Sequence, residues 1–201
     1  MSLTRISTIL DYWFADLNLT PSYFDERLRL WFEKSKDTDA YIKKNFEKDV
    51  EAAARGELSS WEETPEGLLA LIILLDQFSL NLYRGQDKAY LQSQMAIRLS
   101  EKMIETGWVE TLTPGEKLFV YLPFEHSEDM KYQRRSVELF RTMAEEAPLN
   151  LKNELDFFVD FAERHFRVVE KFGRFPNRNA AFSRESTPEE EEFLASPAAP
   201  Y

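Results

Sequence analysis

The chain contains no cysteine and only two histidines among its 201 residues. The absence of cysteine excludes disulfides, thiolate nucleophiles and cysteine-based zinc or iron–sulfur sites. The histidines, His126 and His165, do not stand in an HExxH or similar spacing, so the sequence predicts no metal site. The sequence also lacks a glycine-rich phosphate loop, a dinucleotide fingerprint and a GxSxG string, and we expect no cofactor.

Positive charge is scarce as well. There are 25 Lys and Arg residues against 36 Asp and Glu, which gives a formal net charge of −11. This balance argues against nucleic acid as a partner, because nucleic-acid affinity comes largely from neutralised phosphates, and equally against an anionic membrane. The longest apolar run, from Leu68 to Leu75, is shorter than the roughly 20 residues that span a bilayer. No signal peptide is visible at the start, and we expect a soluble, cytoplasmic protein whose oligomeric state the sequence leaves open.

Helix starts and stops are marked clearly along the chain. Thr suits the N-cap position and Pro the first helical position, and this pair occurs at Thr20-Pro21, Thr64-Pro65, Thr113-Pro114 and Thr187-Pro188. Glu116 and Glu190 complete two predicted capping boxes, and Leu19 with Phe24 forms a predicted hydrophobic staple. Glycines suited to a left-handed residue after a helix occur at Gly56, Gly85, Gly107 and Gly173.

Between these signals, apolar residues recur at helical spacing. The pattern predicts helices near 3–17, 21–35, 38–55, 65–84, 87–106, 114–122, 127–146, 150–173 and 188–195. The one strand-like string, 119–124, contains Pro123, which favours a helix end or kink. With short connections, the sequence indicates an all-α fold of about eight or nine helices in antiparallel pairs. No linker divides the chain, so we expect one domain over 1–194 and a loose tail over 195–201.

Polar residues interrupt apolar helices in three stretches, 71–85, 121–129 and 164–179. Burying such groups costs free energy unless each finds a partner, so they indicate either a binding site or a structural network. In the first stretch, Gln77, Asn81 and Arg84 follow at steps of four and three and share one helix face. Asp76 lies one residue off that face. The alternative is that these residues form the exposed end of the helix.

The second stretch places a histidine beside carboxylates. If the helix that holds Glu128 is extended backwards, His126 and Gln133 fall on one stripe; alternatively, Ser127 caps a new helix and His126 lies in the loop before it. A histidine next to Glu125 or Glu128 has a raised pKa or a fixed tautomer, which general base catalysis requires. A hydrogen bond from His126 to a nearby backbone carbonyl is the structural alternative.

The third stretch combines a core histidine with arginines. His165 lies on an apolar seam between Leu155 and Phe172, a position more typical of a satisfied core residue than of a ligand. A basic stripe on another face consists of Arg164, Arg167, Lys171 and Arg174, with Arg178 beyond Gly173. Such a stripe binds an anion or a partner, or is a solvated face with internal ion pairs. The segment around Pro176 is predicted to be extended, and its guanidinium groups favour a carboxylate or phosphate ligand.

Together these strings resemble those of a mainly bacterial family known as domain of unknown function 924. The matching positions are Gly56, Leu58, Trp61, Leu69-Ala70-Leu71, Leu74 to Phe78, Asn81, Arg84-Gly85, Tyr121-Leu122-Pro123, His126 to Asp129, Gln133, His165, Phe172 to Pro176, Arg178-Asn179, Arg184, Ser186 to Glu190 and Phe193-Leu194. The resemblance covers most of the chain. It implies an all-α fold similar to tetratricopeptide-repeat superhelices and no established activity. Leu80, Asn177 and Ser183 stand where the family pattern has Arg, His and Gly.

We consider two hypotheses for function. In the first, a polar pocket between the middle and last long helices binds an anionic small molecule or a peptide carboxylate. Its predicted lining consists of Gln77, Asn81, Arg84, His126, Glu128, Gln133, His165, Arg174 and Arg178. If the protein is an enzyme, the predicted general base is His126 paired with Glu128, while Arg84 and Arg178 stabilise negative charge.

The second hypothesis is a tetratricopeptide-like scaffold that receives another protein. In that case Asp76, Gln77, Asn81, His126 and His165 form a buried hydrogen-bond network that fixes helix register. Side chains that bond one another without an open cavity would favour this scaffold. Side chains that face a solvent-connected pocket would favour the ligand site.

Overall fold

The computed structural model describes residues 2–15 and 21–196, and every regular element in these ranges is a helix, as predicted. The α segments are α1 (Ser2–Phe14), α2 (Pro21–Phe32), α3 (Lys36–Ala54), α4 (Pro65–Ile72), α5 (Ser79–Leu82), α6 (Ser93–Glu105), α7 (Pro114–Glu125), α8 (Met130–Glu145), α9 (Lys152–Phe172) and α10 (Pro188–Leu194). A π-helical turn, η2 (Ile73–Phe78), joins α4 to α5, so the described residues contain nine continuous helices. The 3₁₀ turns are η1 (Ser59–Glu63), η3 (Asp87–Ala89), η4 (Trp108–Thr111), η5 (Leu149–Leu151) and η6 (Pro176–Arg178).

The predicted caps are present wherever the structure describes them. The hydroxyls of Thr64, Thr113 and Thr187 accept backbone N–H groups at the starts of α4, α7 and α10, and the two predicted capping boxes are formed. All four predicted stop glycines have φ between 69° and 76°, the left-handed region that glycine adopts without steric cost. The Thr20 cap, the Leu19–Phe24 staple, the end of the first predicted helix at 16–17 and most of the tail, 197–201, lie outside the described residues.

The corner between α7 and α8 differs from the prediction. Helix α7 continues through Pro123 to Glu125, and His126 is its C-cap. Pro123 removes one helical N–H, but its neighbours are buried and packing holds the turn. Asp129 caps α8, and Ser127 Oγ accepts the Asp129 N–H at 3.1 Å. The prediction that His126 lies on the α8 stripe was therefore wrong. The alternative prediction that Ser127 caps α8 was also wrong.

Two further segments depart from the predicted boundaries. The predicted helix 87–106 is divided, because η3 turns at 87–89 and α6 begins only at Ser93. After α9, Phe175 is extended, with φ −92° and ψ 109°, as expected for a residue before proline. Residues Pro176–Arg178 then form the 3₁₀ turn η6 and not an extended strand.

The helix from Pro65 lies at the centre of the core. Every side chain from Leu68 to Leu75 is buried, which confirms the core position predicted from its all-round apolar sequence. Aromatic rings from other helices surround it. The Trp13 ring of α1 packs edge-on against Phe78 and Phe119, with ring centroids at 5.2 and 5.5 Å.

The stretch Pro65–Leu82 meets the length and composition of a membrane-crossing helix, although we expected no such stretch from the length of the apolar run. It is 72% buried inside the protein, and a core helix meets the same criteria. Its packing among α1, α3, α6 and α7 accounts for its apolar character.

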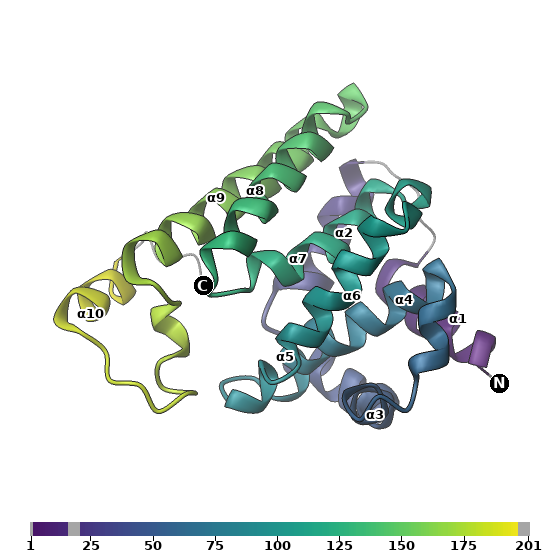
Figure 1. The fold of residues 1–201 in the computed structure, drawn as a ribbon, viewed down its shortest axis with the longest axis horizontal. Coiled ribbons are helices and arrows are strands. Elements are labelled where there is room, and N and C mark those ends of the chain that lie inside the picture. The colour runs from purple at the N-terminus through teal and green to yellow at the C-terminus, as the bar shows by residue number, and fades with distance from the viewer. Residues whose placement is uncertain (1, 16–20, 197–201) are drawn as a thin grey trace.

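The long helices α8 and α9 pack side by side and extend away from the rest of the fold, as Figure 1 shows. At one end of this pair the chain leaves α9, turns through η6 and returns to α10 (Figure 1). We call residues 173–187 the C-terminal strap. The strap contacts the segment after α5, where the Phe182 and Tyr90 rings lie 5.5 Å apart. Residues distant in sequence are thereby brought together next to the end of α7.

We predict that Gly67→Ala destabilises the protein by about 2–4 kcal/mol, as a backbone clash in a packed region does. A Cβ at this position would lie 2.2 Å from the Trp61 carbonyl oxygen and 3.0 Å from the capping Thr64 Oγ1. Urea denaturation measures the loss. Glu66→Ala, an exposed change in the same helical turn, is the control and should alter stability by less than about 0.5 kcal/mol. Equal effects of the two changes would contradict the clash.

Candidate functional site

Polar side chains meet in the interior where η2, the end of α7, α8, α9 and η6 come together. We call this set the polar cluster; it consists of Asp76, Gln77, Glu125, His126, Ser127, Gln133, His165 and Arg178. All are buried except His126, whose side chain is 17% exposed. Seven of the eight members come from the three polar stretches of the sequence, and the cluster lies within an otherwise apolar core, so each member needs a hydrogen-bond partner.

The central contact joins His126 to Asp76, 50 residues earlier in the chain. His126 Nδ1 lies 2.8 Å from Asp76 Oδ1, and Asp76 is 4% exposed. A carboxylate accepts, so Nδ1 carries the proton and Nε2 is the free nitrogen of the neutral ring. No hydrogen bond of Nε2 is found within the described residues, and the His126 side chain as a whole is 17% exposed. Burial lowers the pKa of His126, but the charge and hydrogen bond of Asp76 outweigh it and leave the pKa raised.

This pairing corrects the prediction that His126 works with Glu128. Glu128 instead accepts two hydrogen bonds from Arg184, at 2.7 and 2.9 Å, and one from the Phe175 backbone N–H at 2.8 Å. The reason is the helix boundary, since His126 ends α7 and faces the core while Glu128 follows the turn and faces the C-terminal strap. Burial raises the pKa of Glu128, but the hydrogen bonds from Arg184 and the Phe175 N–H lower it by more, so the pKa falls overall.

The π turn η2 positions Asp76 and Gln77. π turns are rare and recur at functional sites. Both residues are buried, so the interpretation that they begin an exposed helix end was wrong. Gln77 Nε2 donates to Asp76 Oδ2 at 2.6 Å, which occupies the second oxygen of the carboxylate. Asp76 is thus held by Gln77 on one side and by His126 on the other.

Asn81 and Arg84 do not join the polar cluster, although their spacing predicted one face with Gln77. Asn81 Nδ2 donates to Asp39 of α3 at 2.8 Å, and Arg84 forms two hydrogen bonds to the same carboxylate at 3.0 and 2.7 Å. The wide turn η2 changes the phase of a continuous α-helix, which separates these residues from Gln77. Burial raises the pKa of Asp39, but the hydrogen bonds from Arg84 and Asn81 lower it by more, so the pKa falls overall.

Glu125 is the most deeply buried acid of the cluster. It is 1% exposed, and its Oε1 makes no hydrogen bond although it is shielded from solvent. Oε1 lies 3.4 Å from His165 Nδ1. Burial, and to a lesser degree the charge of Asp76, raise the pKa of Glu125 to about 8. Glu125 is therefore a neutral carboxylic acid at pH 7.

His165 lies in the core seam of α9, as predicted, and is 5% exposed. Its Nδ1 lies 3.0 Å from the Phe161 carbonyl oxygen, so this nitrogen carries the proton. Burial lowers the pKa of His165 to about 3, and the ring is neutral at pH 7. The Phe175 ring of the strap packs edge-on against it at 5.5 Å.

Gln133 and Arg178 bring α8 and the strap into the cluster. Gln133 Nε2 donates to the carbonyl oxygens of Glu125 and Ser127, both at 2.6 Å, while its Oε1 is buried without a hydrogen bond. Arg178 Nη1 donates to the His126 carbonyl oxygen at 2.8 Å. Its guanidinium carbon lies 4.4 Å from the centroids of both the Tyr90 and Phe175 rings, so the cation is sandwiched between two aromatic faces. Arg178 is thus the one predicted arginine that lies inside the cluster.

The remaining basic residues hold surface and strap contacts. Arg164, Arg167 and Lys171 pair with Asp160, Glu163 and Glu189, which confirms the ion-paired alternative for most of the stripe. Arg174 binds Glu190 through two hydrogen bonds at 2.6 and 2.8 Å and also donates to the Glu185 carbonyl oxygen. Arg174 therefore stabilises the strap and lies outside the cluster.

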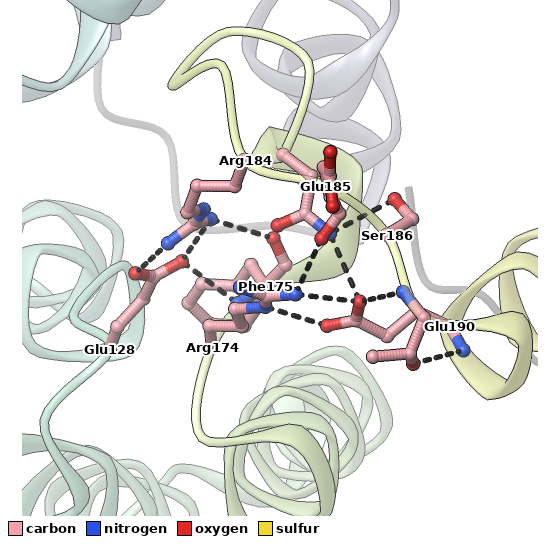
Figure 2. A network of polar contacts seen from close by, with 9 residues as sticks. Glu128, Arg174, Phe175, Arg184, Glu185, Ser186 and Glu190 are labelled. Atoms are coloured by element: carbon pink, nitrogen blue, oxygen red, sulfur yellow. Dashed lines mark hydrogen bonds and ion pairs between the residues drawn. The ribbon is translucent and has the colours of Figure 1, made fainter.

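Two carboxylates, Glu128 and Glu190, hold the strap, and each bonds residues near both of its ends, as Figure 2 shows. Arg184 donates to Glu128 and to the Phe175 carbonyl oxygen, so both backbone groups of Phe175 are held. Glu190 accepts from Arg174, from Asn179 Nδ2 and from the Thr187 N–H. These contacts set the position of Phe175, whose ring packs on Arg178 and His165.

The predicted lining of the ligand site did not include Asp76, Glu125, Tyr90 or Arg184, although the scaffold hypothesis placed Asp76 in a buried network with His126. Asp76 and Glu125 carried a signal, since each is an acid directly after an apolar run of a buried helix. Arg184 was named only as a position of the family pattern, because its contact with Glu128 crosses 56 residues of chain. The contact of Tyr90 with Arg178 also joins distant parts of the sequence, and no local pattern predicts it.

The chain matches the model of a family described as "Bacterial protein of unknown function (DUF924)" over residues 9–198. It is also similar to a solved structure, the protein of unknown function ATU0120 from Agrobacterium tumefaciens, with a TM-score of 0.81 and 32% sequence identity. That match covers 97% of this chain and 99% of the other. A comparison with curated proteins found no match. The predicted family resemblance is confirmed, and none of these matches carries an activity.

We predict that Glu190→Gln weakens the strap and lowers the free energy of unfolding by about 1–3 kcal/mol at pH 7, the range for hydrogen bonds to a charged group. The bonds from Arg174 lower the pKa of Glu190 from 4.5 to about 2, so its contribution is present above pH 4.5 and is lost as pH falls towards 2. The difference between variant and wild type should shrink over that range in urea denaturation. Glu189→Gln, one residue away and exposed, is the control, with an expected change below about 0.5 kcal/mol. A difference that is independent of pH would contradict the assignment.

Proposed function

Because the chain belongs to a family of bacterial proteins of unknown function, DUF924, we propose its function from the polar cluster itself. We propose that the cluster binds the negatively charged group of a small molecule or a peptide carboxylate. His126 then accepts or donates a proton at the bound ligand, Asp76 orients it, and Arg178 supplies positive charge. We place this activity in the cytoplasm, with no resident cofactor.

The observation that carries this proposal is the buried Asp76–His126 pair. A histidine whose Nδ1 is held by a carboxylate at 2.8 Å has one defined tautomer and a more basic Nε2. The His126 side chain is 17% exposed and Nε2 has no hydrogen bond within the described residues, which suits a general base that contacts a ligand.

The charge of Arg178 is the feature near His126 that favours an anionic ligand. The charge of Arg178 acts on His126, His165 and Glu128, and it lowers the pKa of each. Burial raises the pKa of Glu125 to about 8, which reduces the negative charge that this residue adds near His126 at neutral pH. An anion entering next to His126 is attracted by the guanidinium of Arg178.

The predicted binding residues take different roles in this proposal. His126 and Arg178 contact the ligand, whereas Gln77, Gln133 and His165 hold the surrounding groups in place. Asn81, Arg84, Arg174 and Glu128 are bound to other side chains and are left out of the ligand site.

The second candidate function is the tetratricopeptide-like scaffold that binds another protein. One observation favours it: cluster side chains bond to one another and to backbone, as Gln77 does to Asp76 and Gln133 to two carbonyl oxygens. Under this alternative the cluster fixes the corner between α7 and α8 and has no ligand.

We predict that acetate or inorganic phosphate binds the wild-type protein and that His126→Gln weakens this binding about 10- to 100-fold, the effect of losing one hydrogen bond to a charged group. Isothermal titration calorimetry at pH 7 measures the dissociation constants. Asp76→Asn should weaken binding as well, because it releases the ring. Asp39→Asn, the matched change at the carboxylate that holds Asn81 and Arg84, should leave binding unchanged.

A His126 variant that keeps both its stability and its anion affinity would rule out the ligand site. If neither anion binds the wild type and the cluster variants change only stability, the scaffold alternative is supported instead. A wider metabolite screen by thermal shift would then identify the natural ligand if one of the two anions binds.

A separate prediction concerns the proton of His126. Asp76 raises the pKa of His126 above 6.5, so we expect a nuclear magnetic resonance titration midpoint above that value in the wild type. Asp76→Asn should lower the midpoint, whereas Asp39→Asn should not change it. With only His126 and His165 in the chain, and the pKa of His165 at about 3, the signal that titrates near neutral pH belongs to His126. A midpoint that is unaffected by Asp76→Asn would contradict the pairing.

A further inference from the structure

Phenyl rings of α2 and α9 line a cavity of about 180 Å³ at the protein surface. On α9, Phe157 and Phe161 lie one helical turn apart and therefore share a face of the helix. On α2, Phe32 follows Leu28 by one turn in the same way. We call this cavity the aromatic pocket; its lining consists of Leu28, Phe32, Glu33, Phe157, Phe158 and Phe161.

The rings of the aromatic pocket are held in place and still reach solvent. Phe32 and Phe157 are 40% and 50% exposed. The buried ring of Phe158 packs against both, with its centroid 6.0 Å from that of Phe32 and 5.5 Å from that of Phe157. Phe32 also stacks on the core ring of Phe119 at 6.5 Å, and Phe157 on Phe161 at 6.0 Å. Because the exposed rings are preorganised, a ligand has to order little of the protein when it binds.

The charge of the aromatic pocket is negative. Among the described residues that line it, Glu33 is the one charged group, and it is exposed and forms no ion pair in the described part of the chain. The faces of phenyl rings also carry partial negative charge. The grooves along α8 and α9, by contrast, are lined by basic side chains such as Arg134 and Arg167. The aromatic pocket therefore favours a cation.

We propose that the aromatic pocket binds a small molecule with a fully alkylated ammonium group, with phenyl rings around the cation and Glu33 facing its charge. The pocket shares no residue with the polar cluster. The proposal is therefore independent of the proposed function, and neither depends on the outcome of the other.

The lining explains why the ammonium group is alkylated. A primary ammonium has three N–H donors and is strongly hydrated, and Glu33 is the one carboxylate that could accept from it in the pocket. A quaternary ammonium has no N–H, and its methyl groups pack against the rings while its charge is attracted to them. The cavity is also smaller than the roughly 300–1,000 Å³ of sites for drug-sized ligands, which suits a compact cation.

The experiment titrates choline into the full chain and follows the protein amide signals by nuclear magnetic resonance. Dimethylbutanol, in which a carbon atom replaces the quaternary nitrogen of choline, is the neutral probe of the same shape. Ethanolamine is the probe that keeps N–H donors. Phe157→Leu and Glu33→Gln change the pocket. Their matched controls are Tyr41→Leu, at an exposed ring of α3, and Glu26→Gln, at an exposed acid of α2.

We expect choline to bind the wild type at least about fivefold more tightly than dimethylbutanol or ethanolamine. Phe157→Leu should weaken choline binding about 5- to 30-fold, the range of a cation–π contact, and it should leave the fold intact because Phe157 is half exposed. Glu33→Gln should weaken binding about 2- to 5-fold, and less in high salt, because exposed charges are screened. Both control variants should bind choline as the wild type does.

Equal affinities for choline and dimethylbutanol would overturn the proposal and assign the pocket to an apolar group. Absence of choline binding to the wild type, or a folded Phe157→Leu variant with unchanged affinity, would overturn it as well. Tighter binding of a peptide with trimethyllysine than of choline would overturn the small-molecule assignment in favour of a protein partner.

A measurement on the wild type alone keeps the proposal testable if Phe157→Leu does not fold. Nuclear Overhauser effects between the methyl protons of bound choline and phenyl ring protons of the pocket would support the proposal. Their absence with choline bound would overturn it.

Discussion

The hydrogen bond between Asp76 and His126 ties the most apolar helix of the chain to the corner between α7 and α8. Asp76 is buried in the middle of that helix, where an unpaired carboxylate would cost several kcal/mol. His126 satisfies it only if α7 ends at residue 125, and α8 then starts from the turn that Asp129 caps. The direction of the long α8–α9 pair and the position of the strap therefore depend on this one contact.

The charges of the cluster explain how so many polar groups share one interior. Of its two acids, Glu125 has a pKa raised to about 8, and of its two histidines only His126 has a raised pKa. Burial alone would favour the neutral form of each of these groups, so the differences in pKa come from the hydrogen bonds and charges next to each group. Neighbouring titratable groups with divergent pKa values are the arrangement that proton transfer uses, and this is the physical basis of the proposed ligand site.

Local features of the fold could be predicted from the sequence, and the pairings within the site could not. Thr113, Thr187 and their capping glutamates act within four residues, so each was readable from spacing alone. The face of Gln77, Asn81 and Arg84 assumed an unbroken α-helix, and the π turn at 73–78 has no reliable sequence signal. The bonds of Glu128 to Arg184 and of Arg178 to His126 cross more than 50 residues, and only the tertiary structure brings them together.

The strap shows why the arginines of one short string have different roles. Arg174 and Arg184 meet the carboxylates of Glu190 and Glu128 with two hydrogen bonds each, a geometry that fixes orientation as well as distance. Arg178 lies between them in sequence and meets two aromatic faces and a backbone carbonyl. The outer arginines thus anchor the segment, and this anchoring determines where the middle guanidinium lies relative to His126. The guanidinium of Arg178 lies near His126 because the two partly buried ion pairs hold the strap in place.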